Sequence, residues 1–356
     1  MTLDPTRAVA TGSAGSSTLT ISGIKPTGAV FTVTGGQRVL IIQSQGTGAG
    51  AFEIRTTTAA TPVALTLDAP LSNTYGAGAQ AILIRQYTTV SIPAGSTLTG
   101  MAWDGSTGGV LPFEATGGVT VAGTLTMSAT GFRGATHSAS CGYHCTVGTS
   151  GESYLGVGAI SQAANGSGGG GGAQGQDCGM GAGGGYAGAG GTGINNTTGT
   201  CRVAGAPNSS GGTAVGAADL STMYFGGAGG EGGADEDGRY PGPGGNGGGI
   251  LWIRAASIDA TLGVISDNGG LGGNGVQTGC PGNGGCGESG GGGGAGGAVR
   301  LVANTVALAA THLTSSGAIG GTCTCGATNS GAGSVGRIAI RASYVTGTSA
   351  PAYTPL

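Results

Sequence analysis

A three-residue glycine period runs through the second half of this sequence. Written as triplets from Gly269 to Ala298, the chain reads GGL-GGN-GVQ-TGC-PGN-GGC-GES-GGG-GGA-GGA, with glycine first in eight of the ten triplets and second in eight. An extended left-handed helix has three residues per turn, so a chain with this period has faces without side chains. Such helices can pack at backbone distance and hydrogen-bond to one another. We therefore expect ordered polyglycine-II packing; a flexible glycine linker is the alternative.

The composition excludes several classes of protein. Glycine accounts for 86 of the 356 residues, and a helical globule does not fit because each interior glycine costs about 1 kcal/mol relative to alanine. The 12 prolines are too few for collagen. With 12 basic and 15 acidic residues, the net charge of −3 gives no cationic field for nucleic acid. No apolar run reaches the roughly 20 residues that a membrane span needs.

The glycine distribution and an internal repeat define the organisation. Residues 1–107 contain short alternating segments separated by turns, typical of a β-sandwich or barrel-like module for attachment or assembly. Residues 108–345 carry repeated β units that begin at Gly108, Gly248, Gly296 and Gly336, which is typical of a β-solenoid. The sequence predicts an all-β chain with essentially no helix, glycine-rich polyglycine-II insertions between these units, and a C-terminal tail. We place the insertions at residues 136–247, 270–295 and 321–335, and the tail at residues 346–356.

The cysteines lie in the glycine-rich part of the chain. Their even number, in the region with the weakest conventional core, favours disulfides, although the spacing does not give the pairing. Free buried thiols and a metal site formed by His137, Cys141, His144 and Cys145 are the alternatives. The candidate disulfide cysteines are Cys141, Cys145, Cys178, Cys201, Cys280, Cys286, Cys323 and Cys325.

Chemistry-bearing residues are otherwise sparse. Asp235, Glu236 and Asp237 interrupt the glycine triplets and could bind Ca²⁺. No ligand loop of alternating residues surrounds them, so an exposed loop tip is the preferred interpretation. We interpret Phe225 and Trp252 as core residues. Tyrosines at loop tips could contact a receptor. The candidate partner-binding residues are Tyr143, Tyr154, Asn195, Asn196, Asp235, Glu236, Asp237 and Tyr240. No catalytic, cofactor-binding or metal-binding residue is predicted.

Several short motifs carry a resemblance to a known family. They include Gly36–Gly46, Gln86–Val90, Gly131–Gly134, Gly151–Tyr154 and Asp219–Ser221. Together with Asp68–Tyr75, these motifs resemble glycine-rich repeat surface proteins of bacteria and phages over roughly residues 30–345. The triplet region is loosely similar to the glycine-rich tips of phage tail-fibre adhesins that contain polyglycine-II bundles. The resemblance implies surface exposure with adhesive or structural roles, and it implies no catalytic residues.

These observations predict a non-enzymatic virion protein, such as a tail fibre or another exposed adhesin. The N-terminal residues show no secretory signal, which favours the virion surface over the bacterial cell surface or an extracellular location. Expected partners are other virion or surface proteins through residues 1–107, a host receptor or glycan, and further copies of the chain in a homo-oligomer. No cofactor is expected. The alternatives are a self-assembling extracellular filament or matrix protein and a polysaccharide-active β-solenoid enzyme.

Overall fold

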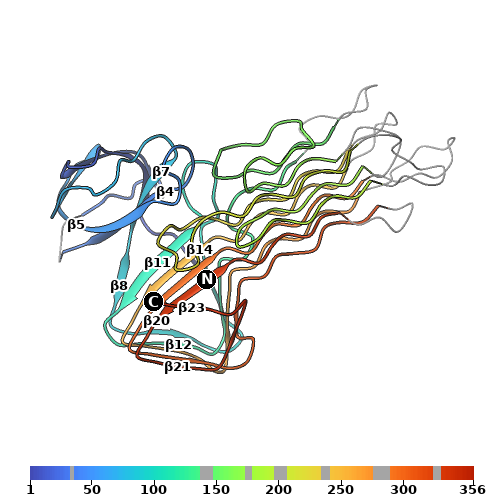
Figure 1. The fold of residues 1–356 in the computed structure, drawn as a ribbon. Helices are drawn as coiled ribbons and strands as arrows, with labels where there is room; N and C mark the ends of the chain where they lie inside the picture. Colours follow the sequence, from blue (N-terminus) through green and yellow to red (C-terminus); the bar gives the residue numbers. More distant parts are fainter. Residues whose placement is uncertain are drawn as a thin grey trace.

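The computed structural model describes residues 1–32, 36–136, 147–172, 179–195, 207–233, 241–275, 289–323 and 330–356. These residues form an all-β protein in which strands β1 to β23 occur and no helix does. The protein has three parts: a closed barrel, a stack of three parallel sheets, and a bundle of extended glycine-rich segments that points away from the stack (Figure 1). The predicted all-β class is confirmed.

Six antiparallel strands close the barrel. Their order around it is β2 (Arg7–Thr11), β3 (Thr18–Lys25), β6 (Ala64–Leu67), β5 (Phe52–Ala60), β4 (Arg38–Gln43) and β7 (Ala79–Leu83). The apolar run in β4 serves two cores. Val39 and Ile41 lie in the barrel interior, whereas Leu40 and Ile42 pack with residues of the stack and bundle. Burial on both faces explains why this strand is apolar without alternation.

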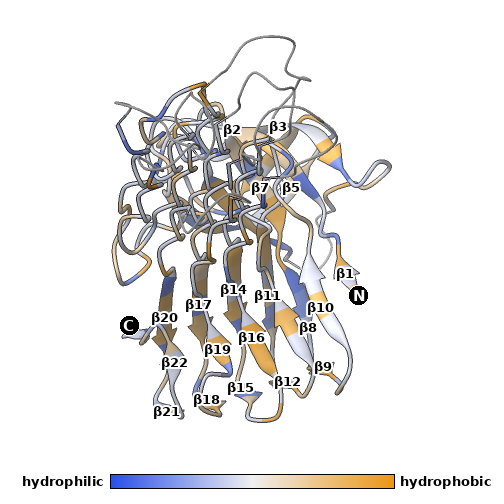
Figure 2. Ribbon diagram, turned by 90° about the vertical axis from the view of Figure 1, so that its right-hand side faces the viewer, coloured by the Kyte–Doolittle hydropathy of each residue, from blue (hydrophilic) through white to orange (hydrophobic). Residues whose placement is uncertain are grey.

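The rest of the regular structure is a stack of three parallel sheets. Each rung contributes one strand to each sheet, and Figure 2 displays the successive rungs side by side. The five rungs of the described chain are β8 (Arg85–Tyr87), β9 (Val90–Ile92), β10 (Thr97–Gly100); β11 (Val110–Ala115), β12 (Gly118–Val121), β13 (Thr124–Thr126); β14 (Ile250–Arg254), β15 (Ser257–Ala260), β16 (Val264–Ser266); β17 (Ala298–Val302), β18 (Thr305–Leu308), β19 (Leu313–Thr314); and β20 (Arg337–Arg341), β21 (Tyr344–Thr346), β22 (Ser349–Ala350). Two short strands, β1 (Thr2–Leu3) and β23 (Thr354–Pro355), extend opposite ends of the stack.

The register follows the sequence repeat. Leu111 pairs with Leu251, Leu251 with Val299, and Val299 with Ile338, so equivalent positions of the repeat lie side by side. The inward side chains of the three sheets form one apolar core that runs through all five rungs. The boundary set at residue 107 from sequence assigns β8–β10 to the N-terminal module, whereas these strands pair with β1 and with β11–β13.

All the long glycine-rich insertions leave the stack at one corner. They separate β13 from β14, β16 from β17, and β19 from β20, which are the third strand of one rung and the first strand of the next. We call their described parts the glycine bundle: residues 131–136, 147–172, 179–195, 207–233, 241–249, 267–275, 289–297, 315–323 and 330–336. These segments run alongside one another away from the stack (Figure 1).

Backbone hydrogen bonds hold the glycine bundle together on a period of three. In residues 226–233, the amides of Gly226, Gly229 and Gly232 donate to residues 248, 245 and 242, each at 2.9 to 3.0 Å. The amides of residues 227, 230 and 233 donate to a second neighbour at residues 185, 182 and 179, and those of 228 and 231 donate to a third at residues 152 and 149. Successive donors therefore point in three directions around the segment.

The same segment also accepts hydrogen bonds from three further neighbours. Amides of residues 169 and 172, of residue 135, and of residues 292 and 295 donate to its carbonyl groups. Six segments thus surround residues 226–233, at a distance that leaves no room for a Cβ at Gly226, Gly229 and Gly232. A Cβ added at Gly229 would lie 2.0 Å from the carbonyl oxygen of Gly292, which is far inside van der Waals contact. The glycine is required here by the close approach of backbones.

Aromatic side chains fill the space where barrel, stack and glycine bundle meet. Phe132 and Phe225 pack edge to face with ring centroids 5.1 Å apart, and Trp103 lies 5.4 Å from Phe225. Phe225 and Trp252 are both buried, as the sequence predicts. This cluster stabilises the attachment of the bundle by burying large apolar side chains at its base.

Candidate functional site

Few of the residues predicted to contact partners fall in the described chain. Tyr143, Asn196, Tyr240 and the acidic triplet of residues 235–237 lie outside the described residues. Tyr154 packs against Tyr224 with ring centroids 5.8 Å apart. Asn195 is buried, and its side-chain amide donates to the carbonyl oxygen of Pro207 at 2.8 Å. Asn195 therefore lies within the packed bundle, where the sequence predicts an exposed loop.

The cysteines and the alternative metal site are mostly outside the described chain. Cys323 is described, buried and disulfide-bonded. The remaining candidates (Cys141, Cys145, Cys178, Cys201, Cys280, Cys286 and Cys325) lie outside, as do His137 and His144. Within the described ranges, no three His, Cys, Asp or Glu side chains gather where they could hold a metal ion.

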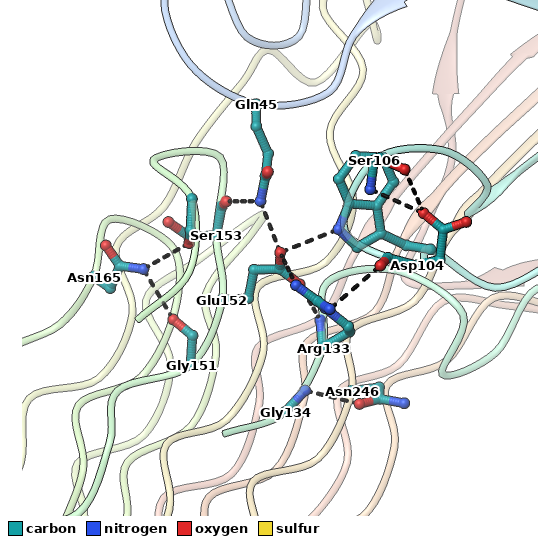
Figure 3. Close-up of polar contacts among 12 residues, drawn as sticks. Gln45, Asp104, Ser106, Arg133, Gly134, Gly151, Glu152, Ser153, Asn165 and Asn246 are labelled. Atoms are coloured by element: carbon teal, nitrogen blue, oxygen red, sulfur yellow. Dashed lines mark hydrogen bonds and ion pairs between the residues drawn. The ribbon is translucent and has the colours of Figure 1, made fainter. Parts of the chain in front are cut away.

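One polar site is centred on the buried carboxylate of Glu152 (Figure 3). The backbone amide and Nε of Arg133 donate to its Oε2 at 2.9 Å each, and Nη2 of Arg133 donates to Oε1 at 3.0 Å. Nε2 of Gln45 and Nε1 of Trp103 also donate to Oε1, at 3.0 and 3.2 Å. Hydrogen bonding to Glu152 raises the pKa of the Arg133 guanidinium. Glu152 thus joins the barrel, the stack and the bundle.

A second polar site ties the barrel to the loop that precedes β11. The carboxylate of Asp104 accepts hydrogen bonds from Nζ of Lys25 at 2.6 Å and from the backbone amides of Ser106 and Thr107 at 2.9 and 3.0 Å. Burial acts to raise the pKa of Asp104, but these hydrogen bonds outweigh it and hold the pKa well below its usual value. Nη1 of Arg133 donates to the Asp104 carbonyl oxygen at 3.3 Å, which connects the two sites.

Three of the sequence motifs that carry the resemblance supply residues to the Glu152 site. Arg133 belongs to the Gly131–Gly134 motif, Glu152 to Gly151–Tyr154, and Gln45 to Gly36–Gly46. A further motif residue, Leu220, uses its carbonyl oxygen to accept a hydrogen bond from Nη1 of Arg300 at 2.8 Å. The sequence alone assigns no structural role to these motifs. Their task in the structure is to fasten the three parts together, because charge-assisted hydrogen bonds are strong in buried positions.

Sequence reasoning missed an exposed apolar loop on the side of the glycine bundle. Leu155, Val157 and Ile160 are 60%, 73% and 68% exposed. The loop is held in place at Asn165, whose Nδ2 donates to the carbonyl oxygens of Gly151 and Gly156 at 3.1 and 3.0 Å (Figure 3). The alternation of apolar residues with glycine in residues 155–160 is the signal that could have identified it.

No protein-family model, curated protein or solved structure matches this chain. The described residues contain no helix long and apolar enough to cross a membrane.

Proposed function

We propose that this chain is a non-enzymatic structural and adhesive surface protein, and specifically an exposed virion component such as a tail-fibre adhesin. In this proposal, the three-sheet stack is a β-solenoid, and the glycine bundle is a polyglycine-II body that projects from it. The body acts as a stiff spacer that carries partner-binding loops.

The observation that carries the proposal is the hydrogen bonding of residues 226–233. Their donors alternate among three neighbouring segments, and three further neighbours donate to their carbonyl groups. A chain bonded to six neighbours cannot bend without breaking several hydrogen bonds at once, so the bundle has the stiffness of a rod. The glycine-rich segments make up a large part of the chain, pack through their backbones and carry few reactive side chains. These features fit a mechanical role.

In the proposed function, exposed residues of the bundle and the barrel contact the partners. We assign partner binding to the loop of Leu155, Val157 and Ile160 and to the acidic residues 235–237. Attachment to neighbouring virion proteins is assigned to the barrel, where Val30 and Val63 are 62% and 64% exposed. Scattered exposed apolar residues are common, but three within six residues form a patch that a partner can cover.

Binding of labelled protein to bacterial cells tests the proposal. We expect the wild type to bind a susceptible strain, and the double substitution Val157→Asp with Ile160→Asp to reduce binding at least tenfold. Leu262→Asp is the matched control, because Leu262 is 79% exposed in a turn of the stack, away from the loop. Failure of the wild type to bind any strain of a broad panel, or equal loss in the control, would contradict the proposal.

Open sheet edges favour a self-assembling filament as the second candidate. At one end of the stack β9 is a terminal strand of its sheet, and at the other end β21 is the terminal strand of the same sheet. Unpaired edges of this kind can template the next copy of the chain. Electron microscopy of the purified protein separates the two candidates, since filaments formed without other virion proteins favour the second.

A further inference from the structure

A long cleft separates the barrel from the outer face of the stack. Its volume is about 1180 Å³, and Phe52 and Ile54 of β5 form the barrel side. The opposite wall comes from the ends of the first strands of the rungs and the corners that follow them. The polar residues of this wall include Gln86, Arg254, Arg300, Asn304, Arg341 and Ser343.

The cleft is elongated along the axis of the stack. Equivalent positions of all five described rungs line it: Tyr87, Ala115, Ala255, Ala303 and Ala342. Neighbouring strands in a sheet lie about 4.8 Å apart, so five rungs span roughly 19 Å. Ala115 and Ala255 belong to the core of the stack, and Ala303 and Ala342 pack against that core. A groove of this length and regularity is suited to a linear chain whose units repeat at a similar distance.

Some charged side chains in the cleft have interaction partners among the described residues, and others do not. The guanidinium of Arg300 lies 5.7 Å from the Phe52 ring centroid and is bonded to loop carbonyls. The carboxylate of Glu114 is paired with Arg38. Arg254 and Arg341 are exposed, and no described acidic side chain forms an ion pair with either one. Two cations are therefore available in the cleft of a protein whose net charge is −3.

The two free arginines lie in one column of the sheet. Arg254 pairs with Val302, and Val302 pairs with Arg341, so the guanidinium groups project from rungs that are two strands apart. That separation is roughly 10 Å. The repeat of a hexopyranose chain is close to the spacing of one strand, and every second sugar carboxylate of a uronic acid chain would therefore meet an arginine. Arg presents a planar fork that matches a carboxylate.

We propose that this cleft binds a carboxylate-bearing polysaccharide of the uronic acid type along the axis of the stack. Arg254 and Arg341 bind alternate carboxylates. Gln86, Asn304 and Ser343 offer hydrogen-bonding groups to the hydroxyls, and Phe52 and Ile54 offer an apolar wall to the sugar C–H groups. The proposal does not rest on the proposed function, since the cleft and the loop of residues 155–160 are separate surfaces.

Calorimetric titration with a hexamer of galacturonic acid tests the proposal. We expect saturable binding to the wild type that weakens as salt is raised, because exposed charges are screened. The neutral maltohexaose should bind at least tenfold more weakly. Absence of hexagalacturonate binding, or equal or tighter binding of single-stranded DNA of six nucleotides, would overturn the proposal.

Variants locate the binding to the cleft. The double substitution Arg254→Gln with Arg341→Gln should weaken binding by roughly tenfold, and the corresponding double Lys variant should retain most of the affinity. Val302→Glu should have the same effect as the double Gln variant, because it places a carboxylate between the two arginines. Arg85→Gln is the control, since Arg85 is exposed on the same sheet but does not line the cleft. Unchanged affinity in the double Gln variant, with its melting temperature equal to that of the wild type, would overturn the assignment.

Discussion

Arg133 and Glu152 form a bidentate ion pair, in which Nε of the arginine donates to Oε2 at 2.9 Å and Nη2 donates to Oε1 at 3.0 Å. The carboxylate is only 3% exposed, whereas the arginine side chain is 44% exposed. The pair therefore lies at the edge of the buried junction. The carboxylate depends on its donors because it has almost no access to water.

Removal of Glu152 should loosen the junction. We expect Glu152→Ala to lower the free energy of unfolding by about 3 kcal/mol, because Arg133, Gln45 and Trp103 lose an acceptor at once. Urea-induced unfolding measures the effect. The control is Asp259→Ala, at an exposed residue of β15 whose carboxylate accepts a hydrogen bond from the Thr261 amide, and this substitution should cost less than about 1 kcal/mol. Equal effects of the two substitutions would show that the buried site has no special role.

Substitutions at two glycines test whether close backbone packing, and not glycine content alone, stabilises the bundle. At Gly229 a Cβ would lie 2.0 Å from the Gly292 carbonyl oxygen, whereas at Gly188 a Cβ would meet nothing within 4 Å. We expect Gly229→Ala to destabilise the protein by about 3 kcal/mol or more, because neighbouring segments must separate. Gly188→Ala should be neutral or stabilise by up to about 1 kcal/mol. Thermal unfolding of both variants decides this, and a tolerated Gly229→Ala would contradict the close packing.

Hydrogen exchange tests whether the glycine bundle is ordered. The amides of residues 226–233 donate to backbone carbonyls at 2.7 to 3.2 Å. We expect them to exchange at least about a thousandfold more slowly than an unstructured glycine chain, because exchange requires the surrounding segments to open together. Mass spectrometry of peptides from this region measures the rate. Exchange within seconds would return the region to the linker interpretation.

Asp267 should give the protein a stability that falls as the pH rises. The residue is fully buried at the corner between the stack and the bundle, and burial raises its pKa well above the usual value, against the effect of the Gly249 and Ala298 amides. The contribution of protonated Asp267 to the free energy of unfolding is therefore fully present below its pKa in the unfolded chain, about 4. This contribution is lost as the pH rises toward the pKa of Asp267 in the folded protein. Asp267→Asn should gain melting temperature relative to the wild type between about pH 3.5 and pH 7. A difference in melting temperature that stays constant over this pH range would show that titration of Asp267 does not affect stability.

Asp104 should have the opposite pH dependence. Its pKa is held low despite partial burial, through hydrogen bonds from Lys25, Thr107 and Ser106. Its contribution is therefore present above the unfolded pKa of about 4 and is lost as the pH falls below it. Asp104→Asn should lower the melting temperature at about pH 7, and the difference should shrink at about pH 3. A difference that grows on acidification would show that the hydrogen bonds are not the cause.

Some of this structure could be predicted from the sequence because it depends on local pattern. The alternation in residues 16–22 and the apolar run of residues 39–42 predict strands, which the structure places at β3 and β4, and the repeat that contains Leu251 and Val299 agrees with the pairing register. The allocation of β8–β10 could not be predicted, since three-residue strands such as Arg85–Tyr87 carry too little pattern to reveal their neighbours. The Glu152 site was also missed, because its donors come from positions as far apart as Gln45 and Arg133.

The glycine insertions all leave the stack at one corner. This arrangement restricts how many times each insertion can cross the bundle. Residues 267–275 run outward and residues 289–297 return, and residues 315–323 and 330–336 do the same. Any insertion that begins and ends at this corner must contain an even number of passes. The body can therefore widen only by whole out-and-back pairs, while the rungs keep their register. Related chains of different length should differ by such pairs, with the five-rung base unchanged.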